Sequence, residues 1–357
     1  MEFALSDDQR MFQASVTGYL EGASPLDRVR EVADGDRGVA EGISLGLSEL
    51  GAGQILVPEA YEGLGLGLLD AALVQEALGA AVAPAAHLGA AMAVAGIVQA
   101  GSDAQQAEWL ARIGSGEVRI GVAVGEHVGA REGAGVTAAD GKLSGKSLFA
   151  LETAGASHVL VCDRDGGLHI ASMSDAGLTR TELQTIDRTR DYAELVFEGV
   201  AATALAGQGG ADWMVLAGRL LLAADTLGAA QVMLDKAVAY ALERKQFGRV
   251  IGSFQAVKHL CAEMAAQLEP ARALVWHAAH AFDEDMDEAA VMICLAKAHL
   301  AEIGTFIART STEVHGGMGF TDLVGLHYWF KRIGANRQLL GGPEQVREDA
   351  ARRQGWA

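Results

Sequence analysis

Residues 241–260, ALERKQFGRVIGSFQAVKHL, join two helical patterns through a short turn. The helical period of the preceding apolar residues runs as far as Lys245, and a second period starts at Phe254. Gly248 and Gly252 interrupt the helix between these points. The stretch therefore predicts a helical hairpin, and a helical domain around it.

Basic side chains gather in this turn although the chain as a whole is acidic. The 357-residue sequence has a formal net charge of −18 at pH 7. Even so, Arg244, Lys245, Arg249 and Lys258 fall within fifteen residues. Cations beside the N-terminus of a helix suit a diphosphate, through charge-assisted hydrogen bonds and the helix dipole. The other interpretation is a helical hairpin with ordinary charges on its rim, and spacing alone leaves both open.

Composition narrows the classes of partner and the compartment. The acidic balance disfavours nucleic acid and anionic membrane surfaces, which need a basic protein face. No apolar run in the sequence reaches the roughly 18 residues that a membrane span needs, and the acidic N-terminus MEFALSDDQRMF is not typical of a signal peptide. Cys162, Cys261 and Cys294 are far apart and show no metal-ligand spacing. These features predict a cytoplasmic protein without a metal site.

The hydrophobic pattern of the chain changes twice along its length. Helical periodicity holds from Leu5 to about Glu117, short β-rich runs follow to about Thr203, and helical periodicity returns from Asp212. We therefore expect three domains, 1–117, 118–205 and 206–357, in a mainly helical protein with a small, antiparallel, barrel-like β domain at its centre. The expected helices include one starting after a Ser6 cap, an alanine-rich one within 69–101, and 212–243, 252–283, 285–312, 322–337 and a last one after Pro343.

Three motifs resemble segments of the acyl-CoA dehydrogenase family, and they follow one another along the chain in the order found in that family. The pattern R-x-Q-F-G-x-x-I-G-x-F-Q covers residues 244–255. Residues 311–322, STEVHGGMGFTD, are similar to the family's Q-x-x-G-G-x-G-[FY] segment, and residues 57–67, VPEAYEGLGLG, match a loop of its N-terminal half. The likeness extends over nearly the whole chain. It implies an α-helical N-terminal domain, a middle β domain and a C-terminal four-helix domain, assembled as dimers or dimers of dimers.

The resemblance also implies FAD as cofactor. By position, it places Arg244, Lys245 and Gln246 on the FAD of the adjacent protomer, with Phe254 and Gln255 near the adenosine. It assigns the loop that approaches the diphosphate from the other side to Glu313, Val314, His315, Gly316 and Gly317. The two glycines permit close backbone approach.

Two places in the sequence depart from the family's flavin site. Glu313 stands where relatives carry glutamine, so its carboxylate is expected to turn away from the diphosphate or to pair with Arg244. In the middle domain, Gly125 of the segment 122–133 replaces a threonine, and Phe149 is expected to cover the far face of the flavin ring.

The family's catalytic base is missing from both of its usual positions. A carboxylate removes the proton alpha to the thioester carbonyl, and the two matching residues here are Leu340 and Gly218. Asp225 lies two helical turns after Gly218. Its neighbours on that helix are apolar or small, without a Lys or Arg in helical reach, so it is either the base or hydrogen-bonded to a neighbouring helix or water. Glu344 is a second candidate.

Two functions are consistent with these residues. The first is an FAD-dependent acyl-CoA dehydrogenase that introduces an α,β double bond into an acyl-CoA and passes electrons to an electron-transferring flavoprotein or a similar acceptor. The second is a non-catalytic subunit that contributes an FAD half-site to a second acyl-CoA dehydrogenase-like subunit. The sequence is similar to bacterial members that act on bulky acyl-CoAs, such as steroid side chains, and that pair unlike subunits.

Overall fold

The computed structural model describes residues 4–125, 127–128 and 133–356. The chain divides into two compact units. The helical unit comprises Met1–Gly35, Ala72–Pro84 and Leu220–Ala357, and the mixed unit comprises Asp36–Ala71 and Ala85–Arg219. Helices α4 (Leu68–Ala80) and α7 (Gly210–Glu243) each contribute residues to both units.

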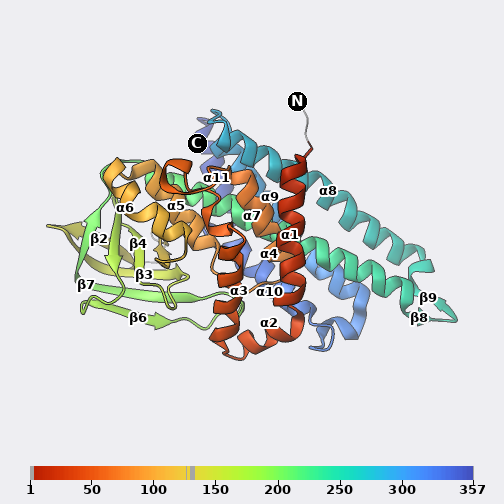
Figure 1. The fold of residues 1–357 in the computed structure, drawn as a ribbon. Coiled ribbons are helices and arrows are strands. Elements are labelled where there is room, and N and C mark those ends of the chain that lie inside the picture. The colour runs from red at the N-terminus through yellow and green to blue at the C-terminus, as the bar shows by residue number, and fades with distance from the viewer. Residues whose placement is uncertain (1–3, 126, 129–132, 357) are drawn as a thin grey trace. The chain divides into compact units, whose positions relative to one another are not determined.

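The helical unit is built around α9 (Ala289–His315), which is buried along most of its length. Besides α9 and its shares of α4 and α7, the unit contains α1 (Asp7–Ala23), α2 (Leu26–Ala33), α8 (Gln255–Asp283), α10 (Leu326–Gln338), α11 (Pro343–Arg353) and the short helix η4 (Gly316–Phe320). Helices α8, α10 and α11 all pack against α9. Figure 1 shows α7 and α8 leading to the β8–β9 hairpin that joins them.

The sequence signals set most of the helix boundaries. The Ser6 side chain accepts from the backbone of Gln9 and the Gln9 side chain accepts in return, which completes a capping box at the start of α1. Pro343 begins α11, where its missing N–H costs nothing. The expected helix within 69–101 is instead two helices, because Pro84 disfavours helical backbone in the residue before it.

The mixed unit combines helices with a seven-stranded sheet. Its helices are α3 (Arg37–Glu49), η1 (Ala52–Gln54), η2 (Glu59–Tyr61), α5 (Leu88–Ala100) and α6 (Asp103–Gly114). Its strands are β1 (Ile120–Ala123), β2 (Gly135–Ala139), β3 (Lys142–Leu151), β4 (His158–Cys162), β5 (Leu168–Ser172), β6 (Leu178–Glu182) and β7 (Tyr192–Ala204). The prediction of a mainly helical protein with a central β region is confirmed.

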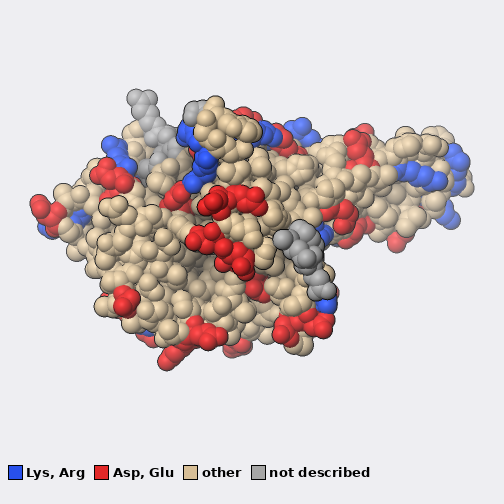
Figure 2. Space-filling model, turned by 90° about the horizontal axis from the view of Figure 1, so that it is seen from above, with Lys and Arg blue, Asp and Glu red and all other residues tan. Residues whose placement is uncertain are grey.

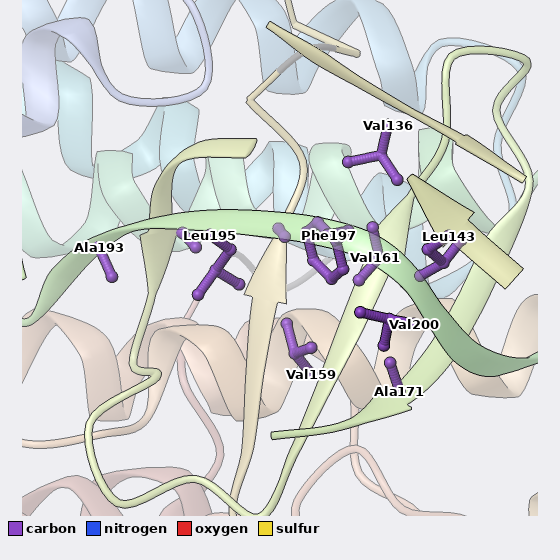
Figure 3. Packing of buried hydrophobic residues seen from close by; sticks show 11 residues of the cluster. Val136, Leu143, Val159, Val161, Ala171, Ala193, Leu195, Phe197 and Val200 are labelled. Atoms are coloured by element: carbon purple, nitrogen blue, oxygen red, sulfur yellow. The ribbon is translucent and has the colours of Figure 1, made fainter. Parts of the chain in front are cut away.

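The sheet closes on itself because β7 pairs with β3 as well as with β5. The ring runs β3–β1–β4–β5–β7, and β2 and β6 extend it at β3 and β7. The expectation of a purely antiparallel sheet was wrong in one pairing, since β1 and β4 are parallel. Figure 3 shows side chains from several strands, including Val159, Leu195 and Phe197, packed together as the core of this sheet.

Two helical runs are long and apolar enough to cross a membrane by length and composition alone. They are Gly210–Glu243 and Ala289–Phe320, and 94% and 56% of their most apolar windows are buried inside the protein. Such burial is typical of core helices.

Candidate functional site

A two-stranded hairpin forms the joint between α7 and α8. Strand β8 (Lys245–Gln246) pairs with β9 (Arg249–Val250), and the connecting residues Phe247 and Gly248 have φ values of +54° and +77°. Two consecutive positive φ angles are typical of the type I′ turn that suits a tight hairpin. The sequence thus located the joint, but not its strands. The hairpin fixes where its basic side chains project.

The cations of this hairpin are exposed. Within the described part of the chain, Arg244, Lys245 and Arg249 form no ion pair, and Figure 2 shows Lys and Arg side chains gathered around this end of the helical unit. The guanidinium of Arg249 lies 4.0 Å from the centre of the Phe254 ring, and the Phe247 ring meets Phe254 edge-on. Gln246 and Gln255 are exposed beside them. Exposed cations without an ion-pair partner leave their charge available to an anionic ligand.

The second predicted segment lies on the same unit, at the end of α9. The His315 ring stacks on Tyr240 of α7 with centroids 4.6 Å apart, and its Nδ1 lies 2.8 Å from the carbonyl oxygen of Ser311. Burial lowers the pKa of His315, the hydrogen bond to Ser311 opposes this effect, and Lys236 lowers the pKa further, which favours the neutral ring. The stack ties the end of α9 to α7, the helix that ends at Glu243, next to Arg244.

The glycines of this segment present open backbone. Gly316 has a φ of +58°, and a Cβ built at Gly316 or Gly317 would meet nothing within 4 Å. Val314 is buried, whereas Glu313 is exposed. Glu313 forms no ion pair with Arg244 among the residues that the structure describes. An accessible backbone of this kind fits the diphosphate of a dinucleotide cofactor, and the cations of the hairpin belong to the same helical unit.

Comparison with known proteins identifies the family. Residues 6–117 match "Acyl-CoA dehydrogenase, N-terminal domain" and residues 207–355 match "Acyl-CoA dehydrogenase, C-terminal domain". The bovine mitochondrial short-chain specific acyl-CoA dehydrogenase is 31% identical over 304 residues, 77% of this chain and 73% of that protein. The chain belongs to the acyl-CoA dehydrogenase family.

Other members of this family match the chain over nearly its full length. Acyl-CoA dehydrogenase IpdE2 of Mycolicibacterium smegmatis is 29% identical over 347 residues, 96% of this chain and 98% of the relative. A chain of the ChsE4–ChsE5 complex from Mycobacterium tuberculosis superposes with a TM-score of 0.90 at 25% identity, covering 100% of both chains. The predictions of the acyl-CoA dehydrogenase fold and of a flavoprotein oxidoreductase family are confirmed.

Asp225, the candidate base of this acyl-CoA dehydrogenase, lies in a buried network. Its Oδ2 is 2.7 Å from Nη2 of Arg332, and the two side chains are 0% and 1% exposed. Gln75 and Asn336 also donate to the carboxylate, and Arg332 donates further to the carbonyl of Ala83. The expectation, drawn from its own helix, of a carboxylate without a cationic partner was wrong, because α10 supplies Arg332. The geometry favours a structural role, and the catalytic role stays a prediction.

Leu340 stands in the loop where relatives carry the base. Leu340 itself is buried and has a φ of +59°. The buried Nζ of Lys297 lies 2.8 Å from the carbonyl oxygen of Asn336 and 3.4 Å from that of Gly341, so it holds the end of α10 and this loop together. Glu344 is largely exposed, 3.6 Å from Arg337. An exposed, ion-paired carboxylate is a poor candidate for the buried base that this chemistry needs.

The predicted flavin-ring contacts belong to the mixed unit. Phe149 is 41% exposed with a φ of +56°, at an irregularity in the β3–β7 pairing. A bulky residue in that backbone region is strained, as often occurs at ligand sites. Of the segment 122–133, residues 126 and 129–132 lie outside the described residues. A Cβ built at Gly125 would lie 2.6 Å from the carbonyl oxygen of Leu148. These ring contacts stay predictions.

Glu152 is a titratable group that sequence reasoning missed. It follows β3, and its carboxylate accepts from the backbone N–H groups of His87 (3.2 Å) and Gly89 (2.9 Å) at the start of α5. Burial raises the pKa of Glu152 to about 7, against the opposing effects of these hydrogen bonds and of Arg190. No local motif marks the residue, because its partners lie more than sixty positions earlier in the chain.

Glu152 makes the stability of the protein depend on pH. The folded state binds this proton more tightly than the unfolded chain, whose glutamate titrates near 4.5. The contribution of Glu152 to the free energy of unfolding is therefore fully present below pH 4.5. This contribution, roughly 3 kcal/mol, is lost as the pH rises through about 7. We expect Glu152→Gln to remove this component, measured by denaturant unfolding at pH 5 and 8. Glu49→Gln, at an exposed position, serves as the control, and its free energy of unfolding should change between pH 5 and pH 8 as much as that of the wild type. If Glu152→Gln also keeps the wild-type change between the two pH values, the prediction is contradicted.

Proposed function

We propose that this chain is an FAD-dependent acyl-CoA dehydrogenase that forms an α,β double bond in an acyl-CoA thioester. The observation that carries the proposal is the set of unpaired cations on the β8–β9 hairpin together with the open backbone at Gly316 and Gly317. Both features lie on the helical unit, within the part of the chain that matches the C-terminal domain of the family, and both are segments that the sequence resemblance assigns to FAD.

The residues present fit a dinucleotide with a charged diphosphate. Arg244 and Lys245 would donate charge-assisted hydrogen bonds to phosphate oxygens and neutralise their charge. Gly316 and Gly317 would let backbone approach the phosphates. Phe254, with Arg249 above its ring, offers an apolar face beside Gln255 for the adenosine. When bound, FAD would supply the acceptor for the hydride from the β carbon of the substrate.

The proposal predicts that flavin content depends on the hairpin cations. Arg244→Ala with Lys245→Ala should lower the FAD content per purified chain, or the affinity for added FAD, at least tenfold, since two phosphate contacts are lost. Flavin absorbance per chain measures this. Arg352→Ala, an exposed and ion-paired arginine of the same unit, is the matched control and should keep full occupancy. Equal FAD content in both variants would contradict the assignment.

A second candidate function is a structural subunit of a heteromeric acyl-CoA dehydrogenase. It is favoured by Leu340 at one base position and by the pairing of Asp225 with Arg332 near the other. The ChsE4–ChsE5 relative is itself a complex of two named chains. If the purified chain alone is yellow and oxidises an acyl-CoA with a dye acceptor, this second candidate fails. An empty chain that gains FAD only with an acyl-CoA dehydrogenase-like partner supports it.

We further propose an electron-transferring flavoprotein, or a similar carrier, as acceptor of the electrons. Because the hairpin would bind the FAD of a neighbouring protomer, we also propose assembly as a homodimer, a homotetramer or a pair with an unlike subunit. The three cysteines are free thiols, as expected for a reducing cytoplasm.

A further inference from the structure

A cavity of about 300 Å³ lies entirely within the mixed unit. Helices α3 and α5 form two of its walls, and the end of α6, strand β1 and Glu152 complete it. Most of its lining is apolar: Leu45, Leu47, Ile55, Val94, Ile113 and Ile120. This volume is at the lower end of the range found for small-molecule binding sites, about 300–1,000 Å³.

The cavity reaches the surface near Leu45, which is 63% exposed. Glu41 and Arg119 also line it, and both are exposed. Their charged groups are 3.5 Å apart, an ion pair whose stability is small in water. A ligand therefore has a route to the interior that breaks no buried interaction.

Among the polar groups inside, Glu152 has spare capacity to accept a hydrogen bond. A carboxylate offers about four lone-pair sites. Backbone N–H groups of His87, Gly89 and Ala90 occupy three of them. The hydroxyl groups of Ser44 and Ser48 already donate to backbone carbonyls one turn earlier in α3. The amides at the start of α5 are engaged by Glu152, so a ligand in the cavity meets a carboxylate and not an anion-binding helix end.

We propose that this cavity binds a compact, mainly apolar alcohol whose hydroxyl group donates to the Glu152 carboxylate. An engineered cavity of about 150 Å³ holds benzene, so twice that volume suits about twelve non-hydrogen atoms. A hydroxyl donor returns to the buried carboxylate part of the solvation that it loses on folding. None of the residues assigned above to FAD lines this cavity, and the proposal does not rest on the function proposed above.

Binding of 2-naphthol to the full chain tests the proposal, with 2-methoxynaphthalene as the matched probe that lacks the donor. We expect saturable binding of 2-naphthol at pH 8, at least tenfold tighter than binding of the ether. We also expect its affinity to fall several-fold at pH 6, because protonation of Glu152 removes the acceptor charge. Equal affinity for both probes, or affinity that does not change with pH, would overturn the role of Glu152.

Two alanine variants test the location. Ala91→Leu fills the cavity from α5 and should weaken 2-naphthol binding at least tenfold without lowering Tm. Ala104→Leu adds the same atoms on the exposed face of α6 and should bind as the wild type does. If Ala91→Leu folds and binds normally, the cavity is not the site. If Ala91→Leu does not fold, the comparison of the two probes across pH in the wild-type chain still decides the proposal.

Discussion

Replacing Gly79 by alanine is expected to destabilise the helical unit by at least about 3 kcal/mol. A Cβ at Gly79 in α4 would lie 2.0 Å from the carbonyl oxygen of Asp225 in α7. The reverse contact is as tight, since a Cβ at Gly228 would lie 1.9 Å from the carbonyl oxygen of Glu76. Each obstacle is backbone, so the clash is relieved only if the helices move apart. Gly228→Ala should therefore cost a similar amount.

A third glycine in the same unit provides a control of opposite sign. Gly18 lies within α1, and a Cβ built there meets nothing within 4 Å. Gly18→Ala should stabilise the protein by about 0.5–1 kcal/mol, the usual gain of alanine over glycine in a helix interior. Denaturant unfolding of the three variants measures the effects. Stability of Gly79→Ala within 1 kcal/mol of wild type would show that α4 and α7 are not in backbone contact.

The fold was predictable where the signal is local. The Ser6 capping box, the periodicity of the long C-terminal helices and the β-rich middle segment each depend on residues close in sequence. The parallel pairing of β1 with β4 was not predictable, because alternation of side chains is the same in parallel and antiparallel strands. The break near Pro84 could have been predicted from the proline itself. It was missed because the alanine-rich composition was taken to indicate one continuous helix.

The candidate site divides in the same way. The hairpin cations lie within fifteen residues, so they could be found from spacing and motif. The environment of Asp225 could not, because Arg332 is 107 positions later in the chain and reaches it from another helix. Helical neighbours alone gave an apolar surrounding for a carboxylate that in fact accepts several hydrogen bonds. The charged partners of a buried side chain come from tertiary contacts, and a local sequence pattern does not encode these contacts.

Breaking the Asp225–Arg332 pair is expected to cost about 3–5 kcal/mol, the usual penalty for leaving one charge buried without its partner. Arg332→Met should show this loss in denaturant unfolding. Asp225→Leu with Arg332→Met should be more stable than the sum of the two single changes predicts, because the double variant leaves neither charge unpaired. Strict additivity would mean that the two groups do not interact, against the 2.7 Å contact.

Asp225→Asn separates the structural role of this residue from the catalytic one. Asparagine keeps the shape of aspartate but turns an NH₂ group toward the donors of Arg332 and Asn336, so stability falls in either case. The two roles differ in the rate of the folded, flavin-loaded fraction, measured with a dye acceptor at a temperature well below the midpoint of unfolding. Loss of a general base lowers that rate by about 10²–10⁴-fold, and loss of a structural ion pair leaves it within a few-fold. Because Gln75, Arg332 and Asn336 all donate hydrogen bonds to the Asp225 carboxylate, we expect the smaller effect.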